Sequence, residues 1–403
     1  MTTYPSQQQN VPAPTPQPRA GRRWADIGIA SILSALLATG GTYAVVTATD
    51  GDAGQTGSTA AQTTDAGGQT SDAVEDGAAT GTPASFTTDA EWAAVAEAVG
   101  PSVVSIEVAG FSGSGSGSGV VWDAEGHVIT NAHVVEGAQE VQVVLADGRR
   151  YEATVAGSDP SSDLAVLSLA DAPDDLSPIA VGDDAALRVG DPVMAVGNPL
   201  GLSGTVTTGI VSALDRPVTT EAVNAQTGIP EAVVTNAIQT SAAINPGNSG
   251  GALVNAAGEL VGINSSIASI ASPGQSQAGS IGIGFAIPAG KVRLIADQLI
   301  ETGRAEHAFL GVGLADGSAE VDGAVRTGAL VRQVEPGSPA AGAGLQDGDL
   351  ITAIDGEHVT SSLALVGQIR ERGTGEEAEL EYVRDGELAT VSVTLDTRPD
   401  EQP

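Results

Sequence analysis

The chain has 403 residues, no cysteine and a formal net charge of −34, with Lys291 as its only lysine. The lack of cysteine excludes disulfides, thiol catalysis and cysteine-based metal sites. The negative charge argues against nucleic acid or an anionic lipid surface as a partner of the soluble part, and a general solubility trait accounts for it without any specific function.

The first part of the chain does not have the pattern of a folded domain. Residues 1–23 begin with a stretch rich in Gln, Pro and Thr and predict a disordered cytoplasmic tail. Residues 47–87 are mainly Ala, Gly, Thr, Ser, Gln and Asp without an apolar period, which predicts a disordered acidic linker.

Residues 24–46 predict a single transmembrane helix between these two segments. About twenty uncharged residues run from Ile27 to Val46, enough for a helix to span roughly 30 Å of hydrocarbon. A cleaved signal peptide is the alternative, but its apolar core is shorter, roughly 7 to 15 residues, and a buried core helix lacks partner helices. Three arginines precede the apolar run, so we expect a cytoplasmic N-terminus and the folded part of the chain outside the cell membrane.

The folded part is predicted to be mainly β. A capping-box pattern at 88–91 starts a short helix that ends at Gly100-Pro101. Short apolar runs separated by Gly/Asp turns then predict two sets of strands and an all-β barrel architecture. The first set is 103–108, 119–122, 127–131, 141–145, 151–158 and 164–169; the second is 192–196, 205–214, 233–239, 252–254, 260–266 and 284–287. Residues 289–302 have helical periodicity and end at Gly303, where we place a domain boundary.

The pentapeptide Gly247–Gly251 has the composition of an acyl-transfer nucleophile. It frames Ser249 with glycines, which allow a sharp turn whose N–H groups converge on one point. Alone it is equally well explained as a tight surface turn, so it requires a base and a carboxylate.

His133 is the favoured base among four histidines. It follows the apolar run 128–132, which places the imidazole at a strand end facing a cleft. His127 is expected to start that strand in an exposed position, His307 to lie in a polar stretch after a helix, and His358 to follow a turn.

Asp163 is the favoured carboxylate because it opens the apolar run 164–169, where a half-buried acid is costly unless paired. Asp159, in Ser158-Asp159-Pro160, is better explained as a turn former.

Several strings together resemble the HtrA-type (Deg-type) serine proteases, a chymotrypsin-like family with a C-terminal PDZ domain. They lie at 117–121, 130–135, 163–167, 196–201, 239–251 and 282–288. The order His, Asp, Ser is that of chymotrypsin. The resemblance covers about residues 89 to 395 and implies a chymotrypsin-like double β-barrel at 88–303, a PDZ domain at 306–397 and a tail at 398–403.

The resemblance implies roles for single residues. Ser249 would be the nucleophile, His133 the general base and acid, and Asp163 the orienting carboxylate, while Gly247, Asn248 and Ser249 would form the oxyanion hole. Ile267 would line the specificity pocket and favour cleavage after small aliphatic residues, since Asp297 is the only acid between Leu260 and Gln298. No cofactor and no metal are expected.

The C-terminal strings resemble a PDZ domain that binds peptide C-termini. Leu310, Gly311 and Val312 match its carboxylate-binding loop, and the string 347–351 is typical of the domain. A peptide would add there as a strand, with the helix at about 362–372 beside it.

The resemblance also has departures. Ser241 replaces an Asp found in many relatives, and the Gly/Ser run at 109–118 is shorter than the regulatory loop of cage-forming relatives and is predicted to be a plain flexible loop. The shorter run argues against a large closed cage. The resemblance implies a homotrimer, and we expect it to be anchored in the lipid bilayer and to cleave unfolded or damaged proteins. A PDZ-gated stress sensor or chaperone with a largely inactive resting protease is the alternative.

Overall fold

The computed structural model describes residues 92–110, 113–199, 204–223, 230–265, 280 and 282–398, the side chains of 220–223 and 230–233 excepted. The predicted tail, transmembrane helix and linker lie outside these ranges, as do the capping box and Ile267. Within the described ranges, no helix has the length and apolar character needed to cross a membrane.

The first barrel closes from six strands in the order β1-β2-β3-β6-β5-β4. Every neighbouring pair is antiparallel, and apolar positions of the strands form a core that includes Ile106, Val128 and Leu167, while others, such as Ile129 and Val166, belong to a second cluster. The bounds are β1 (Val103–Gly110), β2 (Gly113–Val121), β3 (His127–Thr130), β4 (Ala138–Val144), β5 (Arg150–Asp159) and β6 (Leu164–Leu169).

The Gly/Ser run is a strand rather than a loop over most of its length, so that prediction was wrong. β2 begins at Gly113 and pairs with β1 in continuous register, with Ser118 opposite Ser105. A Cβ at Gly117 would lie 2.7 Å from Val134, and one at Gly119 would lie 2.7 Å from Val128. The glycines therefore serve close packing, which composition alone does not separate from flexibility.

The second barrel closes in the order β10-β11-β12-β9-β8-β7 around a core that includes Val193, Val211 and Leu253. Its strands are β7 (Pro192–Gly197), β8 (Thr205–Val223), β9 (Pro230–Thr240), β10 (Ala252–Asn255), β11 (Leu260–Ser265) and β12 (Gly284–Pro288). β8 and β9 extend well beyond the predicted bounds because they continue as a paired ribbon past the barrel.

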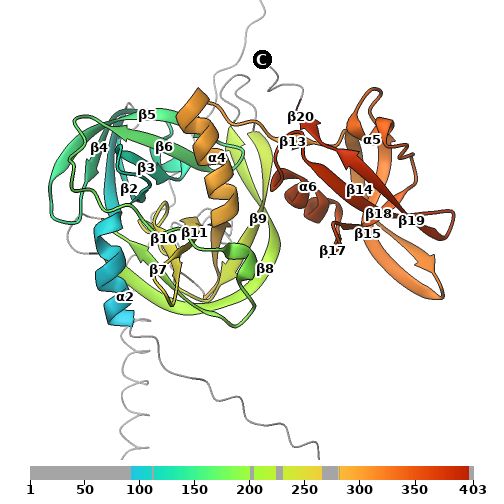
Figure 1. Cartoon of the computed structure of the whole chain (residues 1–403), viewed down its shortest axis with the longest axis horizontal. Helices are drawn as coiled ribbons and strands as arrows, with labels where there is room; N and C mark the ends of the chain where they lie inside the picture. The colour runs from blue at the N-terminus through green and yellow to red at the C-terminus, as the bar shows by residue number, and fades with distance from the viewer. Residues whose placement is uncertain are drawn as a thin grey trace, which may run out of the picture. The chain divides into compact units, whose positions relative to one another are not determined.

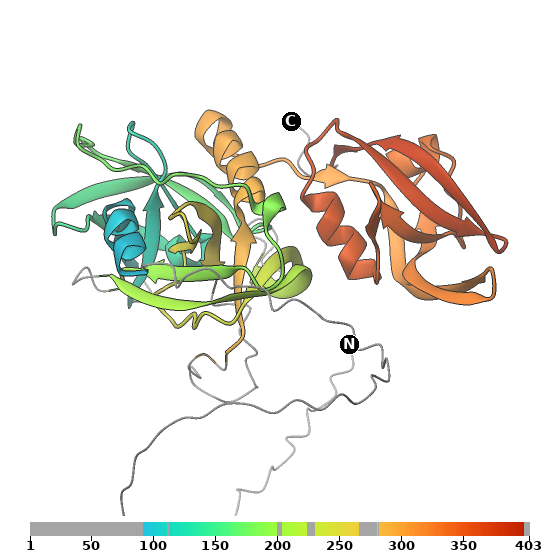
Figure 2. The same ribbon diagram turned by 60° about the horizontal axis from the view of Figure 1, so that its bottom comes forward.

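Helices complete this part of the chain. α2 (Trp92–Val99) leads through the 3-10 turn η1 (Gly100–Ser102) into β1, and η2 (Asp184–Ala186) precedes β7. α4 (Ala289–Thr302) has the predicted bounds and ends at Gly303, whose φ is 73°. Its buried face, which includes Ile295 and Leu299, packs against β5 and β6 of the first barrel and β11 and β12 of the second (Figures 1 and 2).

The C-terminal domain is a separate β-sheet with its own core, which includes Val331, Ile351 and Leu380. The main sheet runs β14-β15-β16-β18-β19, with β17 on β16, and β13 pairs with β20. The bounds are β13 (Ala308–Phe309), β14 (Val312–Val321), β15 (Ala324–Val334), α5 (Pro339–Gly342), β16 (Leu350–Ile354), β17 (Glu357–His358), α6 (Ser362–Arg370), β18 (Glu377–Arg384), β19 (Glu387–Thr394) and β20 (Asp396–Thr397).

Candidate active site

His133 and Asp163 meet on the first barrel. His133 is the second residue of the short helix α3 (Ala132–Val135), which begins two residues after the end of β3, so the imidazole lies just beyond the strand, close to where the sequence predicts it. Its Nδ1 is 2.8 Å from Asp163 Oδ1, and its backbone N–H donates to the same oxygen at 3.2 Å. One carboxylate oxygen therefore fixes both the backbone and the ring of the histidine.

Asp163 is held in an uncommon backbone conformation. Its φ is 57°, in the left-handed region that Asp tolerates better than most residues and that often occurs at functional sites. Asn131 Nδ2 donates to its carbonyl oxygen at 2.9 Å, and Ser265 Oγ donates to its Oδ2 at 3.0 Å. Both carboxylate oxygens are thus engaged, and Oδ1 remains directed at His133.

Sequence reasoning did not identify Asn131 and Ser265. Asn131 carried a usable signal, because it is a polar residue that ends an apolar run, and it is fully buried. The sequence around Ser265 carries no such signal. It lies 102 residues from Asp163 and comes from β11 of the other barrel, so only the packed structure brings the two together.

Ser249 lies in a turn immediately before β10 of the second barrel. Asn248 N–H donates to Asn245 O at 3.0 Å, which makes Pro246 and Gly247 the central residues of a β-turn. Gly247 has φ of 100°, the signature of a type II turn. A Cβ on Gly247 would collide with Pro199, so this position requires glycine twice over.

The backbone after Ser249 is also held by contacts with neighbouring segments of the protein. Gly250 has φ of 82° and donates its N–H to Asn264 O at 2.9 Å. A Cβ on Gly250 would overlap Ser118 O, and one on Gly251 would overlap Val196 O. The glycine frame therefore reflects close backbone approach on both sides of Ser249, which is 4% exposed.

The first barrel pairs an imidazole with a carboxylate, and the serine turn of the second barrel lies against the residues just before that histidine, since a Cβ on Gly250 would lie 3.2 Å from Asn131 N. An imidazole whose Nδ1–H is held by a carboxylate presents its Nε2 as a base, and a glycine turn of this type presents N–H donors to a developing oxyanion. These are the requirements for acyl transfer by a serine hydroxyl.

The turn that carries Asp163 is itself anchored by Asp159. The Asp159 carboxylate accepts from Ser161 N–H at 3.0 Å and from Ser162 Oγ, as a turn former should. It also lies 3.1 Å from His307 Nε2, and His307 is buried. Burial raises the pKa of Asp159, but the hydrogen bond and charge of His307, together with Ser162, outweigh burial and lower the pKa below its usual value.

Leu310 and Gly311 of the predicted peptide-binding loop lie between β13 and β14, and Val312 is the first residue of β14. Gly311 has φ of 81°. Leu310 O accepts from Ala340 N–H and Gly311 O accepts from Glu335 N–H, both at 2.9 Å. The loop carbonyls are therefore tied to the start of α5 and the end of β15.

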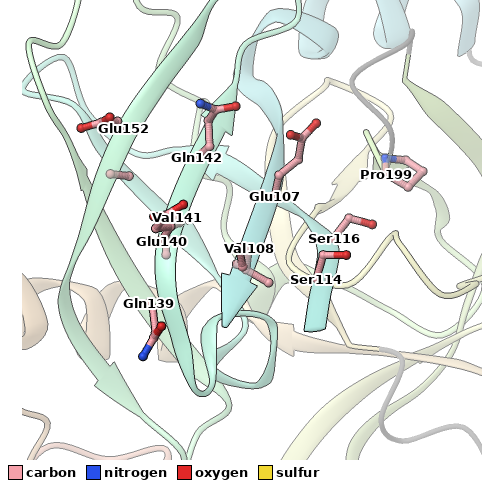
Figure 3. A pocket seen from close by; sticks show the side chains of 13 residues that line it. Glu107, Val108, Ser114, Ser116, Gln139, Glu140, Val141, Gln142, Glu152 and Pro199 are labelled. Carbon is pink, nitrogen blue, oxygen red and sulfur yellow. The ribbon is translucent and has the colours of Figure 1, made fainter. Parts of the chain in front are cut away.

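An open hollow of about 850 Å³ is lined mostly by residues of the first barrel (Figure 3). Its lining includes Glu107, Gln142, Glu152 and Pro199 but none of His133, Asp163 or Ser249. Glu107 is paired with Arg150 at 2.7 Å, which is typical of a solvated surface. The hollow lacks a nucleophile with a base, so its size does not make it the reactive site.

Comparisons with known proteins agree with this geometry. Residues 117–263 match the model of the trypsin-like peptidase domain, and residues 308–395 match that of the PDZ domain. The chain is 45% identical over 314 residues to the serine protease PepD of Mycobacterium tuberculosis, covering 75% of this chain and 65% of that protein. It is 44% identical over 288 residues to the periplasmic pH-dependent serine endoprotease DegQ of Escherichia coli, covering 70% and 60%.

The solved structure of the HtrA-type protease AlgW with a tripeptide is also similar. It has a TM-score of 0.58 and 35% identity, and the match covers 76% of this chain and 97% of that one. Among the curated relatives, the chain spans 65% of PepD and 56% of the periplasmic serine endoprotease DegP of Salmonella typhimurium.

Proposed function

The chain belongs to the HtrA-type family of trypsin-like serine proteases with a PDZ domain, and on this premise we propose that it is a serine endopeptidase whose nucleophile is Ser249. His133 is the general base and then the general acid, and Asp163 is the orienting carboxylate. The observation that carries this proposal is the 2.8 Å contact between His133 Nδ1 and Asp163 Oδ1, beside a glycine-framed serine turn.

The geometry suggests how the reaction would proceed. Asp163 accepts a hydrogen bond from His133 Nδ1–H, which stays on the ring, and so leaves Nε2 free to take the proton of the Ser249 hydroxyl as Oγ attacks the scissile carbonyl. The N–H groups of Gly247 and Ser249 stabilise the oxyanion, with Asn248 between them. His133 then donates its proton to the leaving amine, and water hydrolyses the acyl-enzyme by the same steps.

Substrate selection is assigned to two parts of the chain. From the resemblance, Ile267 would give the specificity pocket an aliphatic wall suited to small aliphatic side chains before the scissile bond. The loop Leu310 to Val312 binds a peptide C-terminus, and the peptide adds along β14. Together these features suit unfolded or damaged proteins, whose chain ends and apolar segments are accessible.

An extracytoplasmic location is the third part of the proposal. The names of DegP and DegQ describe them as periplasmic, and the arginines before residues 24–46 favour a cytoplasmic N-terminus. We propose a single-pass anchor in the cell membrane and a homotrimeric catalytic part.

Casein cleavage tests the proposed activity. Ser249→Ala should lower the rate by several orders of magnitude, since the covalent route is lost while the fold is kept. Undiminished cleavage by this variant would overturn the assignment.

The alternative is a sensor or chaperone whose protease domain is largely inactive at rest. The positive φ of Gly247 favours the protease over this alternative, because it is the conformation of the type II turn that we propose for the active oxyanion segment.

A further inference from the structure

Ser118 connects the first barrel to the turn that carries Ser249. It lies on β2, is fully buried, and belongs to no part of the triad. Its Oγ donates to Gly247 O at 2.6 Å and accepts from Asn198 N–H at 2.8 Å. The hydroxyl therefore uses both its donor and an acceptor on backbone of the second barrel.

The backbone of Ser118 makes two further bonds at the same place. Its N–H donates to Ser249 O at 2.9 Å, and its carbonyl accepts from Thr130 Oγ1 at 2.8 Å. One residue thus holds both ends of the segment from Gly247 to Ser249. The packing here leaves no space for a side chain at position 250, because a Cβ on Gly250 would overlap Ser118 O.

The hydrogen bond from Ser118 matters because the residue that it holds, Gly247, is a glycine. Gly247 has little intrinsic preference in φ and ψ, so its peptide planes turn easily unless they are bonded. Type I and type II turns differ in the orientation of the central peptide, and here that peptide carries the Gly247 N–H. A hydrogen bond on Gly247 O fixes the following peptide plane and so limits this rotation.

We propose that Ser118 is a positioning residue that holds the oxyanion segment in its reactive geometry from the opposite barrel. It acts through Gly247 and Ser249 and does not touch the substrate. This inference rests on the proposed protease function.

Ser105 is a matched control. It faces Ser118 across the β1–β2 ladder and is equally buried, but its Oγ has no hydrogen-bond partner among the described residues. Ser105→Ala and Ser118→Ala therefore remove the same atom from neighbouring sites and differ in the bonds that are lost.

The test measures kcat and KM of the full chain on fluorescently labelled casein, with melting curves for each variant. Losing a whole oxyanion donor lowers kcat about 10²- to 10³-fold, so loosening one should lower kcat roughly 10- to 100-fold in Ser118→Ala, with KM changed less than about twofold. Ser105→Ala should stay within about twofold of wild type in both.

If Ser118→Ala does not fold, Ser118→Cys replaces it, because the thiol keeps the shape and only a weak donor. Its kcat should also fall. A folded Ser118→Ala or Ser118→Cys protein with wild-type kcat would overturn the inference, as would an equal loss in Ser105→Ala. A wild-type chain that does not cleave casein would instead overturn the proposed function, and the inference with it.

Discussion

Ser265 on the second barrel donates a hydrogen bond to Asp163 on the first, with 3.0 Å between Ser265 Oγ and Asp163 Oδ2. The other oxygen of the same carboxylate contacts His133 Nδ1 at 2.8 Å. The orientation of the carboxylate therefore depends on how the two barrels pack, as well as on the turn that carries it.

Ser265→Ala should lower kcat about tenfold. The substitution removes one hydrogen bond to a charged group, worth about 1.5 kcal/mol. Without this bond to Oδ2 the carboxylate can rotate, which moves Oδ1 out of the position that aligns His133. Steady-state kinetics on labelled casein would show the change. Ser168→Ala, a partly buried serine of β6 near the end of the strand far from Asp163, is the control and should keep wild-type kcat.

Asp163→Asn should lower kcat by about 10⁴-fold while the protein stays folded. The amide can donate where the carboxylate accepts, so His133 takes the wrong tautomer and cannot accept the serine proton at Nε2. Asn tolerates the observed φ of 57° as well as Asp does, so the variant removes the charge without straining the backbone. Equal activity of this variant and wild type, at matched circular dichroism, would remove Asp163 from the mechanism.

Gly247→Ala should abolish activity, whereas Gly190→Ala should retain it. The two glycines have φ of 100° and 99°, so both substitutions strain the backbone by about 1 to 2 kcal/mol. Only Gly247 has a neighbour in the way, because its Cβ would collide with Pro199, while the Gly190 position is open. Melting temperatures and casein cleavage of the pair would separate general strain from loss of the oxyanion turn.

Asp159→Asn should weaken the protein's stability at neutral pH and flatten its loss of stability in acid. The pKa of Asp159 is lowered below 3.8 in the folded state, so its contribution to folding is fully present above the ordinary value. That contribution disappears as pH falls from about 4 through the lowered folded pKa. Urea unfolding of both proteins between pH 7 and pH 2 measures the difference, and parallel curves would contradict the pairing with His307.

The sequence predicts the barrel strands well because their signals are local, and the signals that single out the candidate reactive residues are local too. Runs such as 164–169 alternate or cluster apolar residues, and Ser249 is framed by glycines whose spacing follows from the backbone conformation. The helix at 289–302 has an apolar face and a Gly stop, so even its ends are predictable.

Other features depend on tertiary packing, which local sequence does not encode. The glycines of β2 resemble a flexible loop until Val134 and Val128 are placed against them. His307 lies in a polar stretch of the sequence, yet it is buried and its ring contacts the carboxylate of Asp159, 148 residues away. Ser118 and Ser265 are ordinary serines in the sequence, and their partners lie on the opposite barrel.

Labelling with a fluorophosphonate probe tests the central claim most directly, because the probe reacts only with an activated serine beside a formed oxyanion hole. The full chain should take up one label without added peptide, mass spectrometry should map it to Ser249, and Ser249→Ala should take up none. Labelling that requires a C-terminal peptide would support the gated alternative instead. A wild-type chain that stays unlabelled with and without peptide, or that is labelled at another residue, would contradict the account.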